Sequence, residues 1–223
     1  VGSEMCIRDR CRKETSILPL LQSVEKLIPM YADSASVLLN SIQAPDELTD
    51  KDFAHWCMLC GKVTDEAATG LLPIYQWQRA QQWFTEHGTA EEQTQIDLYL
   101  GRAYVEDGEY DKAMQIYADA LQLAKEHQAY NVAGYICAYM ADLYGFRDIT
   151  SECLKKREEA CEFFKKAENY KSYAYSLKDL AGEWAILDSF ACTIPLLQKA
   201  DSISQLLHNK NLTAAIANAF ALI

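Results

Sequence analysis

The side chains with the clearest chemical potential are a histidine and two cysteines, in the stretch His55-Trp56-Cys57-Met58-Leu59-Cys60. Two cysteines at this spacing can ligate zinc or form a redox pair, but a zinc site usually needs a second pair of ligands, and the sequence offers none. We therefore expect structural thiols that pack as small apolar side chains, and the same of Cys137 and Cys153. A redox or metal site is the alternative.

Other residues that could perform catalysis give weaker signals. Glu91-Glu92 and Glu158-Glu159 are adjacent carboxylates, but solvated helix faces or first helical turns explain such pairs. The sequence has no Gly-x-Ser-x-Gly turn to expose a nucleophilic serine and no glycine-rich loop to bind phosphate. We expect no catalytic residue, no metal and no cofactor, so the protein is predicted not to be an enzyme.

The composition indicates what kind of structure positions these side chains. The chain has 223 residues, of which 50% are hydrophobic and 24% charged, and its 9 Gly and 5 Pro are too few for an all-β fold with many turns. Lys and Arg total 21 against 32 Asp and Glu, a net charge of -11. This charge repels phosphate backbones, so binding of nucleic acid is disfavoured.

A period of 40 residues organises most of the sequence. Small residues recur at this interval, at Ala80, Ala120, Ala160 and Ala200. Pairs of a large and a small residue recur as well, at Leu100-Gly101, Met140-Ala141 and Leu180-Ala181. Self-similarity at a fixed period is typical of repeat proteins. It predicts four repeats, over residues 54–93, 94–133, 134–173 and 174–213.

The second repeat carries the clearest pattern, formed by Leu100, Gly101, Tyr104, Gly108, Tyr110, Ala113, Tyr117 and Ala120. This pattern resembles the tetratricopeptide repeat (TPR), which pairs a first helix carrying large, small and aromatic residues with a second carrying small, large and small ones. We expect Gly101 to mark a close approach of two backbones, since glycine within a helix costs about 1 kcal/mol. Gly108 should end the first helix in the left-handed conformation.

The resemblance implies an all-α fold, a right-handed TPR-like α-solenoid of antiparallel helix pairs. The period of 40 exceeds the usual 34, and the positions where a proline is common near the end of the second helix hold none. The sequence is therefore most similar to the bacterial long-repeat type of TPR array.

The regions outside the four repeats, which together span residues 54–213, have separate interpretations. Residues 1–10 resemble a translated sequencing adapter and are read as a non-native scar. Residues 11–53 are expected to form an N-terminal helix pair that breaks at Pro29. Residues 214–223 read as the truncated first helix of a further repeat.

The resemblance also implies a binding groove. In TPR arrays certain first-helix positions line the concave face, and a protein or peptide partner binds there. By position in the repeat, the groove residues are His55, Met58, Lys62, Gln95, Leu98, Arg102, Tyr135, Asp142, Tyr175 and Lys178. A solvated surface without a ligand is the alternative. Because the asparagines that accompany Lys62 and Arg102 in chaperone adaptors are missing, a C-terminal Glu-Glu-Val-Asp ligand is not expected.

Two functional hypotheses follow. The first is a non-enzymatic scaffold that binds a protein or peptide, as the sensor or interaction part of a larger bacterial regulatory protein. The second is a self-sufficient TPR lipoprotein of the cell envelope, anchored in the membrane through Cys11, which precedes a polar leader. The first hypothesis is compatible with a cytoplasmic protein, and the second requires export.

Overall fold

The computed structural model describes residues 17–67 and 69–222, and in this part of the chain the long elements are all α-helices. They are, in order, α1 (Leu18–Asn40), the short 3-10 helix η1 (Pro45–Glu47), α2 (Asp50–Ala67), α3 (Ile74–His87), α4 (Ala90–Glu106), α5 (Tyr110–Glu126), α6 (Tyr130–Phe146), α7 (Thr150–Lys166), α8 (Tyr170–Ile186), α9 (Phe190–Leu206) and α10 (Lys210–Phe220). Consecutive helices pack against each other, and the even-numbered helices also stack, α2 on α4 and α4 on α6. The predicted all-α, TPR-like solenoid of antiparallel helix pairs is confirmed.

From α4 onward the helices begin at a constant interval of 20 residues. Ala90, Tyr110 and Tyr130 are the first residues of three successive helices, and the same interval continues to Lys210. Each helix from α4 to α9 has 17 residues, so connections of three residues join them. Two helices and two connections make up the period of 40 that the sequence shows.

The short connections share one backbone turn. The middle residue of each has a positive φ, at Gly108, Gln128, Asp148, Glu168, Asp188 and His208. The following amide donates a hydrogen bond to a carbonyl five residues earlier, as from Glu109 N to Tyr104 O at 2.9 Å. This is the Schellman arrangement, which satisfies carbonyls at a helix end. The left-handed conformation predicted for Gly108 is confirmed, with a φ of 79°, and five non-glycine residues adopt it as well.

Glycines inside the helices leave room for aromatic rings. A Cβ atom at Gly101 would overlap the ring of Tyr117, and one at Gly134 would lie 2.7 Å from the ring of Phe164. Both rings are fully buried or nearly so. The expectation that two backbones meet at Gly101 was therefore wrong in its detail, because a side chain of the partner helix fills the space.

The N-terminal region contains two helical segments that meet at a kink next to Pro29, where a break was expected. Both segments fall within α1, but Tyr31, with a φ of -143° and a ψ of 55°, is not helical and separates them. A proline removes one backbone hydrogen bond and crowds the preceding turn, which a kink can accommodate. Leu21 before the kink and Leu39 after it are buried in the same cluster as residues of α2, and α1 packs on α2.

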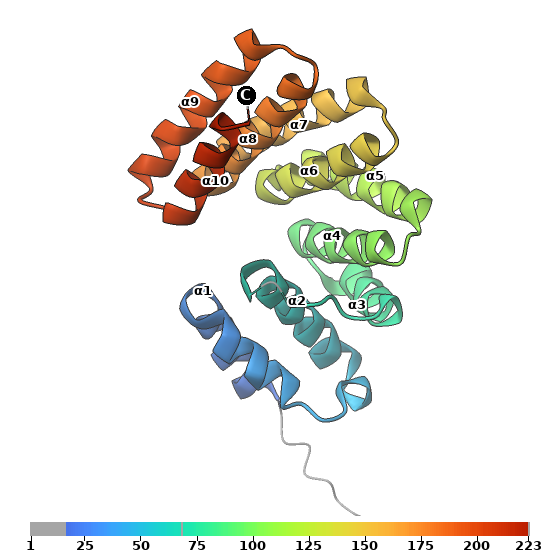
Figure 1. Cartoon of the computed structure of the whole chain (residues 1–223). Helices are drawn as coiled ribbons and strands as arrows, with labels where there is room; N and C mark the ends of the chain where they lie inside the picture. Colours follow the sequence, from blue (N-terminus) through green and yellow to red (C-terminus); the bar gives the residue numbers. More distant parts are fainter. Residues whose placement is uncertain (1–16, 68, 223) are drawn as a thin grey trace, which may run out of the picture.

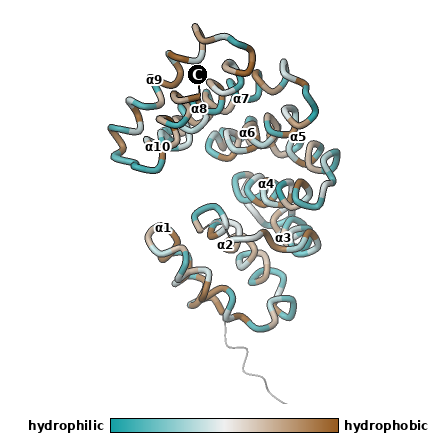
Figure 2. Tube along the Cα trace, in the orientation of Figure 1, coloured by the Kyte–Doolittle hydropathy of each residue, from teal (hydrophilic) through white to brown (hydrophobic). Residues whose placement is uncertain are grey.

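The hydrophobic core consists of two clusters that meet at α4. One joins α1 to α4 and contains Trp77 and Tyr99. The other joins α4 to α10 and contains Leu98, Tyr117 and Ile216. Figure 2 shows hydrophobic and hydrophilic residues following one another along each helix, as expected when one face of every helix is buried.

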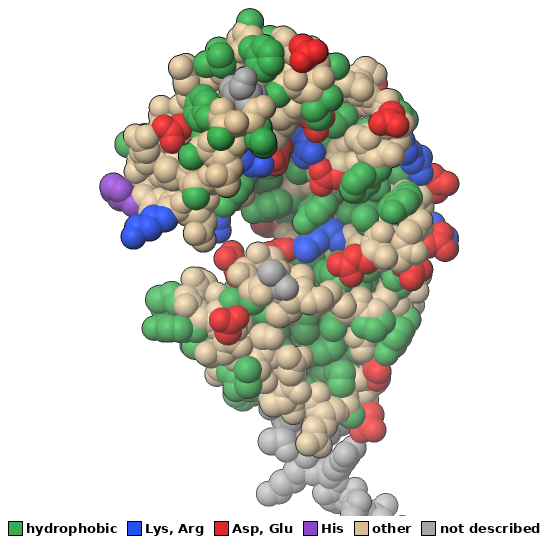
Figure 3. Space-filling model, viewed as in Figure 1, with side chains coloured by type: hydrophobic (Ala, Val, Ile, Leu, Met, Phe, Trp, Pro, Cys, Tyr) green, Lys and Arg blue, Asp and Glu red, His purple; other side chains and the backbone are tan. Residues whose placement is uncertain are grey.

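The array curves, so its two ends approach the same side of the molecule. In Figure 1 the chain rises from α1 at the bottom through α4 and α6 to α9 and α10 at the top, and α1 and α10 both lie on the left. Between them the surface is hollowed, and acidic and basic side chains gather around the hollow (Figure 3).

Candidate functional site

Most of the predicted groove residues line three neighbouring pockets of the even-numbered helices. His55, Met58, Lys62 and Gln95 line a cavity of about 390 Å³, the N-terminal pocket. Leu98, Tyr135 and Tyr175 line a cavity of about 370 Å³, the central pocket. Lys178 lines a cavity of about 520 Å³, the C-terminal pocket. Arg102 and Asp142 line none of the three, but each pairs with a residue that does.

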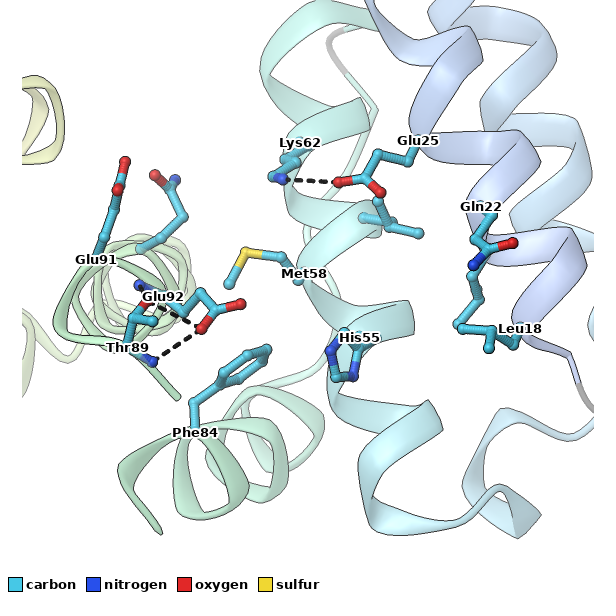
Figure 4. A pocket seen from close by; sticks show the side chains of 13 residues that line it. Leu18, Gln22, Glu25, His55, Met58, Lys62, Phe84, Thr89, Glu91 and Glu92 are labelled. Atoms are coloured by element: carbon cyan, nitrogen blue, oxygen red, sulfur yellow. Dashed lines mark hydrogen bonds and ion pairs between the residues drawn. The ribbon is translucent and has the colours of Figure 1, made fainter. Parts of the chain in front are cut away.

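The N-terminal pocket is formed by α1, α2 and α4, with Phe84 from α3 below (Figure 4). Its interior is apolar, since Met58 and Phe84 are buried there. His55 is fixed by a hydrogen bond of 2.7 Å between its Nδ1 and the carbonyl oxygen of Lys51. Lys62 Nζ lies 3.8 Å from the carboxylate of Glu25 on α1, so helix α1 completes a wall that the repeat pattern alone could not predict.

The central pocket spans the widest range of the sequence. It receives residues from the C-terminal end of α2, from α4 and α6, and from the first half of α8. Tyr135 is held by a hydrogen bond of 2.7 Å to the hydroxyl of Ser172 and by an edge contact with Phe164, with ring centroids 4.8 Å apart. Tyr139 and Tyr175 also line it. A tyrosine-rich hollow of this kind offers apolar ring faces together with hydroxyl groups.

Arg102 is a structural residue at the edge of the central pocket. Its guanidinium pairs with Asp65 of α2 and lies 5.3 Å from the centroid of the Tyr139 ring. Tyr99 donates a second hydrogen bond to Asp65, at 2.8 Å. Burial raises the pKa of Asp65, an effect that Arg102 and then Tyr99 oppose. Arg102 thus joins α2 to α4, and its charge is largely matched within the chain.

A group of one arginine and two carboxylates connects α6, α7 and α8. Arg157 occupies the position in the repeat where Trp77, Tyr117 and Leu197 are buried. Its Nη2 lies 2.6 Å from Asp142 Oδ1, and its Nε lies 3.4 Å from a carboxylate oxygen of Glu183. The side chain of Arg157 is 12% exposed, so a guanidinium with two carboxylates takes the place of a large buried apolar or aromatic residue at this interface.

Sequence analysis missed Asp65, Tyr139 and Glu25, which shape the pockets as much as the predicted residues do. A signal was available for part of this set. Asp65 contacts Arg102, and Tyr135 contacts Ser172, each pair separated by 37 residues. A separation of 40 residues leads to the equivalent position of the next repeat, and 37 residues leads to a position about one helical turn earlier. Residues at this separation face each other on stacked helices. Glu25 gave no comparable signal because α1 lies outside the periodic region.

The cysteines that could have formed a metal or redox site are mostly packed in the core. Cys57, Cys137 and Cys153 are buried and Cys60 is half-buried. Burial raises the pKa of the Cys60 thiol to about 12 and also raises that of Cys57. Both are protonated near neutral pH and therefore poor nucleophiles and ligands. Residues 17–67 and 69–222 contain no cluster of three or more potential metal ligands.

The membrane hypothesis rests on Cys11, which lies outside the described residues, as do the scar-like residues 1–10. Among the helices described, none is sufficiently long and apolar to cross a bilayer.

No protein-family model matches this sequence, and no curated protein has a significantly similar one. Solved structures do match the fold. The apo form of RapI is 14% identical with a TM-score of 0.66, and the match covers 92% of this chain and 82% of RapI. A signal transduction ATPase with numerous domains, with a tetratricopeptide repeat sensor, from Pyrococcus horikoshii is 13% identical with a TM-score of 0.66. That match covers 91% of this chain but 33% of the ATPase.

A putative kinesin light chain from Podosopora anserina, with nearly identical TPR-like repeats, is 12% identical with a TM-score of 0.55. The match covers 87% of this chain and 97% of that one. At these identities the comparisons define a class of fold, the TPR-like repeat structures. The class is usually non-catalytic.

Proposed function

We propose that this chain is a non-enzymatic scaffold that binds a protein or peptide segment in the hollow of the solenoid. The observation that carries the proposal is the central pocket, where Tyr135, Tyr139 and Tyr175 come together from α6 and α8. Tyrosines are enriched among the residues that dominate protein interfaces, because they bury a large ring and still offer a hydroxyl group.

The arrangement favours an extended or helical segment over a small metabolite. The N-terminal and central pockets both open on the even-numbered helices, and together they run from α1 to α8. A groove built from successive repeats suits a ligand that is itself linear. The net charge of -11 opposes nucleic acid as the ligand.

The biological setting that we propose is the sensor or interaction part of a larger bacterial regulatory protein. The likeness to the Pyrococcus ATPase supports the role of a sensor part, since the match covers a third of that protein, which has a tetratricopeptide repeat sensor. The second setting is that of a self-sufficient envelope lipoprotein anchored through Cys11, and it would use the same groove to bind its partner.

The test is a selection of randomised displayed peptides against the purified full chain, followed by affinity measurements with one enriched peptide. Tyr175→Ala removes a ring from the central pocket, and we expect it to weaken binding at least tenfold. Tyr170→Ala is the matched control, since this tyrosine begins the same helix, is 48% exposed and lies outside the pocket. Equal affinities of the two variants would reject the central pocket as the binding site.

A further inference from the structure

The N-terminal pocket combines an apolar interior with a charged rim. Leu21, Met58, Leu59 and Phe84 are buried around it, whereas Leu18 at its edge is 48% exposed. Figure 4 shows side chains of α1 and α4 facing one another across α2, with Met58 between them. Methionine adapts its shape to different apolar partners, so the pocket suits a side chain that enters from outside.

The charges on the rim are predominantly negative. Glu25 comes from α1, Glu91 and Glu92 come from the first turn of α4, and Lys62 is the cation that lines the pocket with them. Three carboxylates and one ammonium leave a local charge of -2. The 3.8 Å between Lys62 and Glu25 is a long ion pair between half-exposed groups, so neither charge is fully matched.

The two glutamates of α4 differ in what they can offer to a ligand. Glu92 Oε2 accepts a hydrogen bond of 2.8 Å from the Thr89 amide, and the Glu92 amide donates one of 3.3 Å to Thr89 Oγ1, so the two residues form a capping box. This cap satisfies the start of α4, so the helix N-terminus is not an anion site. Glu91 is exposed and forms no ion pair with any residue in the described part of the chain.

We infer that the N-terminal pocket is a subsite for a large apolar side chain of the partner, next to a lysine or arginine that faces Glu25 and Glu91. The inference rests on the proposed function and specifies the chemistry of its ligand. A volume of about 390 Å³ is ample for one or two apolar side chains. Exposed carboxylates contribute modestly to affinity, but they strongly select the sign of the partner's charge. An acidic or phosphorylated segment would be repelled here.

The experiment uses the same displayed peptide library and the full chain. We expect enriched peptides to carry Leu, Met or Phe beside Lys or Arg. The variant Glu25→Gln/Glu91→Gln should weaken their binding roughly tenfold and reduce its dependence on salt. The matched control, Glu106→Gln/Glu162→Gln, removes the same charge from two exposed glutamates that line none of the three pockets. It should change affinity less than twofold.

The outcomes separate this inference from the proposed function. Enriched peptides that are acidic, or that bind the rim variant and its control equally well, would overturn the subsite. If such peptides still lost affinity with Tyr175→Ala, the groove would stand as a binding site without this specificity. If no peptide were enriched against the folded chain, both the subsite and the proposed function would be rejected.

Discussion

Asp97 on α4 should make the stability of the solenoid depend on pH. Its carboxylate is directed between α3 and α4, where Gln81 Nε2 donates a hydrogen bond of 2.7 Å. Burial raises the pKa of Asp97 from 3.8 to about 6, and the nearby charge of Asp119 adds to this, while Gln81 opposes it. Folding therefore favours the protonated acid, because the ionised form loses hydration that one amide does not replace.

The direction of the effect follows from the two pKa values. The stabilisation by protonated Asp97 is complete below pH 3.8 and is lost as the pH rises through about 6. A shift of about two units corresponds to about 3 kcal/mol in total, of which about 1.3 kcal/mol disappears between pH 5 and pH 7. Asn at this position mimics the neutral acid at every pH. The free energy of unfolding of Asp97→Asn, relative to that of the natural chain, should therefore increase by about 1.3 kcal/mol from pH 5 to pH 7.

The assay is urea unfolding followed by circular dichroism, at pH 5 and pH 7, for the natural chain and Asp97→Asn. Asp33→Asn, which removes an exposed carboxylate of α1, serves as the charge-matched control and should show no such growth. Comparing each variant with the natural chain at the same pH cancels the contributions of other titrating groups, including Asp65. A difference between natural chain and Asp97→Asn that stays constant from pH 5 to pH 7 would refute the reasoning.

Further predictions concern the glycines and the turns that shape the repeats, each measured by chemical unfolding. Gly101→Ala should destabilise the fold by about 1–3 kcal/mol, because the added methyl group overlaps the buried ring of Tyr117. Gly182→Ala should instead stabilise the fold by about 1 kcal/mol, since nothing lies within 4 Å of the new Cβ atom and alanine favours the helix. Equal effects of Gly101→Ala and Gly182→Ala would contradict this account of the packing. Gly108→Ala should cost about 1 kcal/mol, whereas Glu168→Gly, at the equivalent position of another turn, should gain a similar amount. Effects of the same sign in both turns would show that the left-handed conformation is not what decides stability there.

The fold could be predicted from the sequence because the residue types that define the helix faces recur at a fixed interval. Leu100, Gly101 and Tyr104 have the spacing of one helix face, and the interval of 40 residues then fixes how many such helices follow one another. The turn at Gly108 could be predicted for the same reason, since glycine is the residue that adopts a positive φ most easily. The equivalent turns at Gln128 and Glu168 could not, because their residue types carry no such preference.

The candidate site was harder to predict, because its properties depend on pairs of residues in different repeats. Position in the repeat assigned Tyr135 and Tyr175 to the same groove, and both line the central pocket. The groove positions alone did not single out the ion pair between Arg102 and Asp65, which the separation of 37 residues between facing positions could have indicated. The wall contributed by α1 could not be predicted either, because α1 lies outside the periodic region and is interrupted next to Pro29.

The division of the core into two clusters that meet at α4 has a consequence for how the molecule loses its structure. Residues within one cluster contact each other directly. The helices before α4 are connected to those after α5 chiefly through their packing on α4 and through the ion pair between Asp65 and Arg102. In a linear array, stability is approximately a sum of local terms. The segment α1 to α3 can therefore open as a cooperative unit while α5 to α9 stay folded, so amide hydrogens of α2 would exchange faster than those of α6. The N-terminal pocket is formed between this unit and α4, so a ligand bound there would oppose the local unfolding.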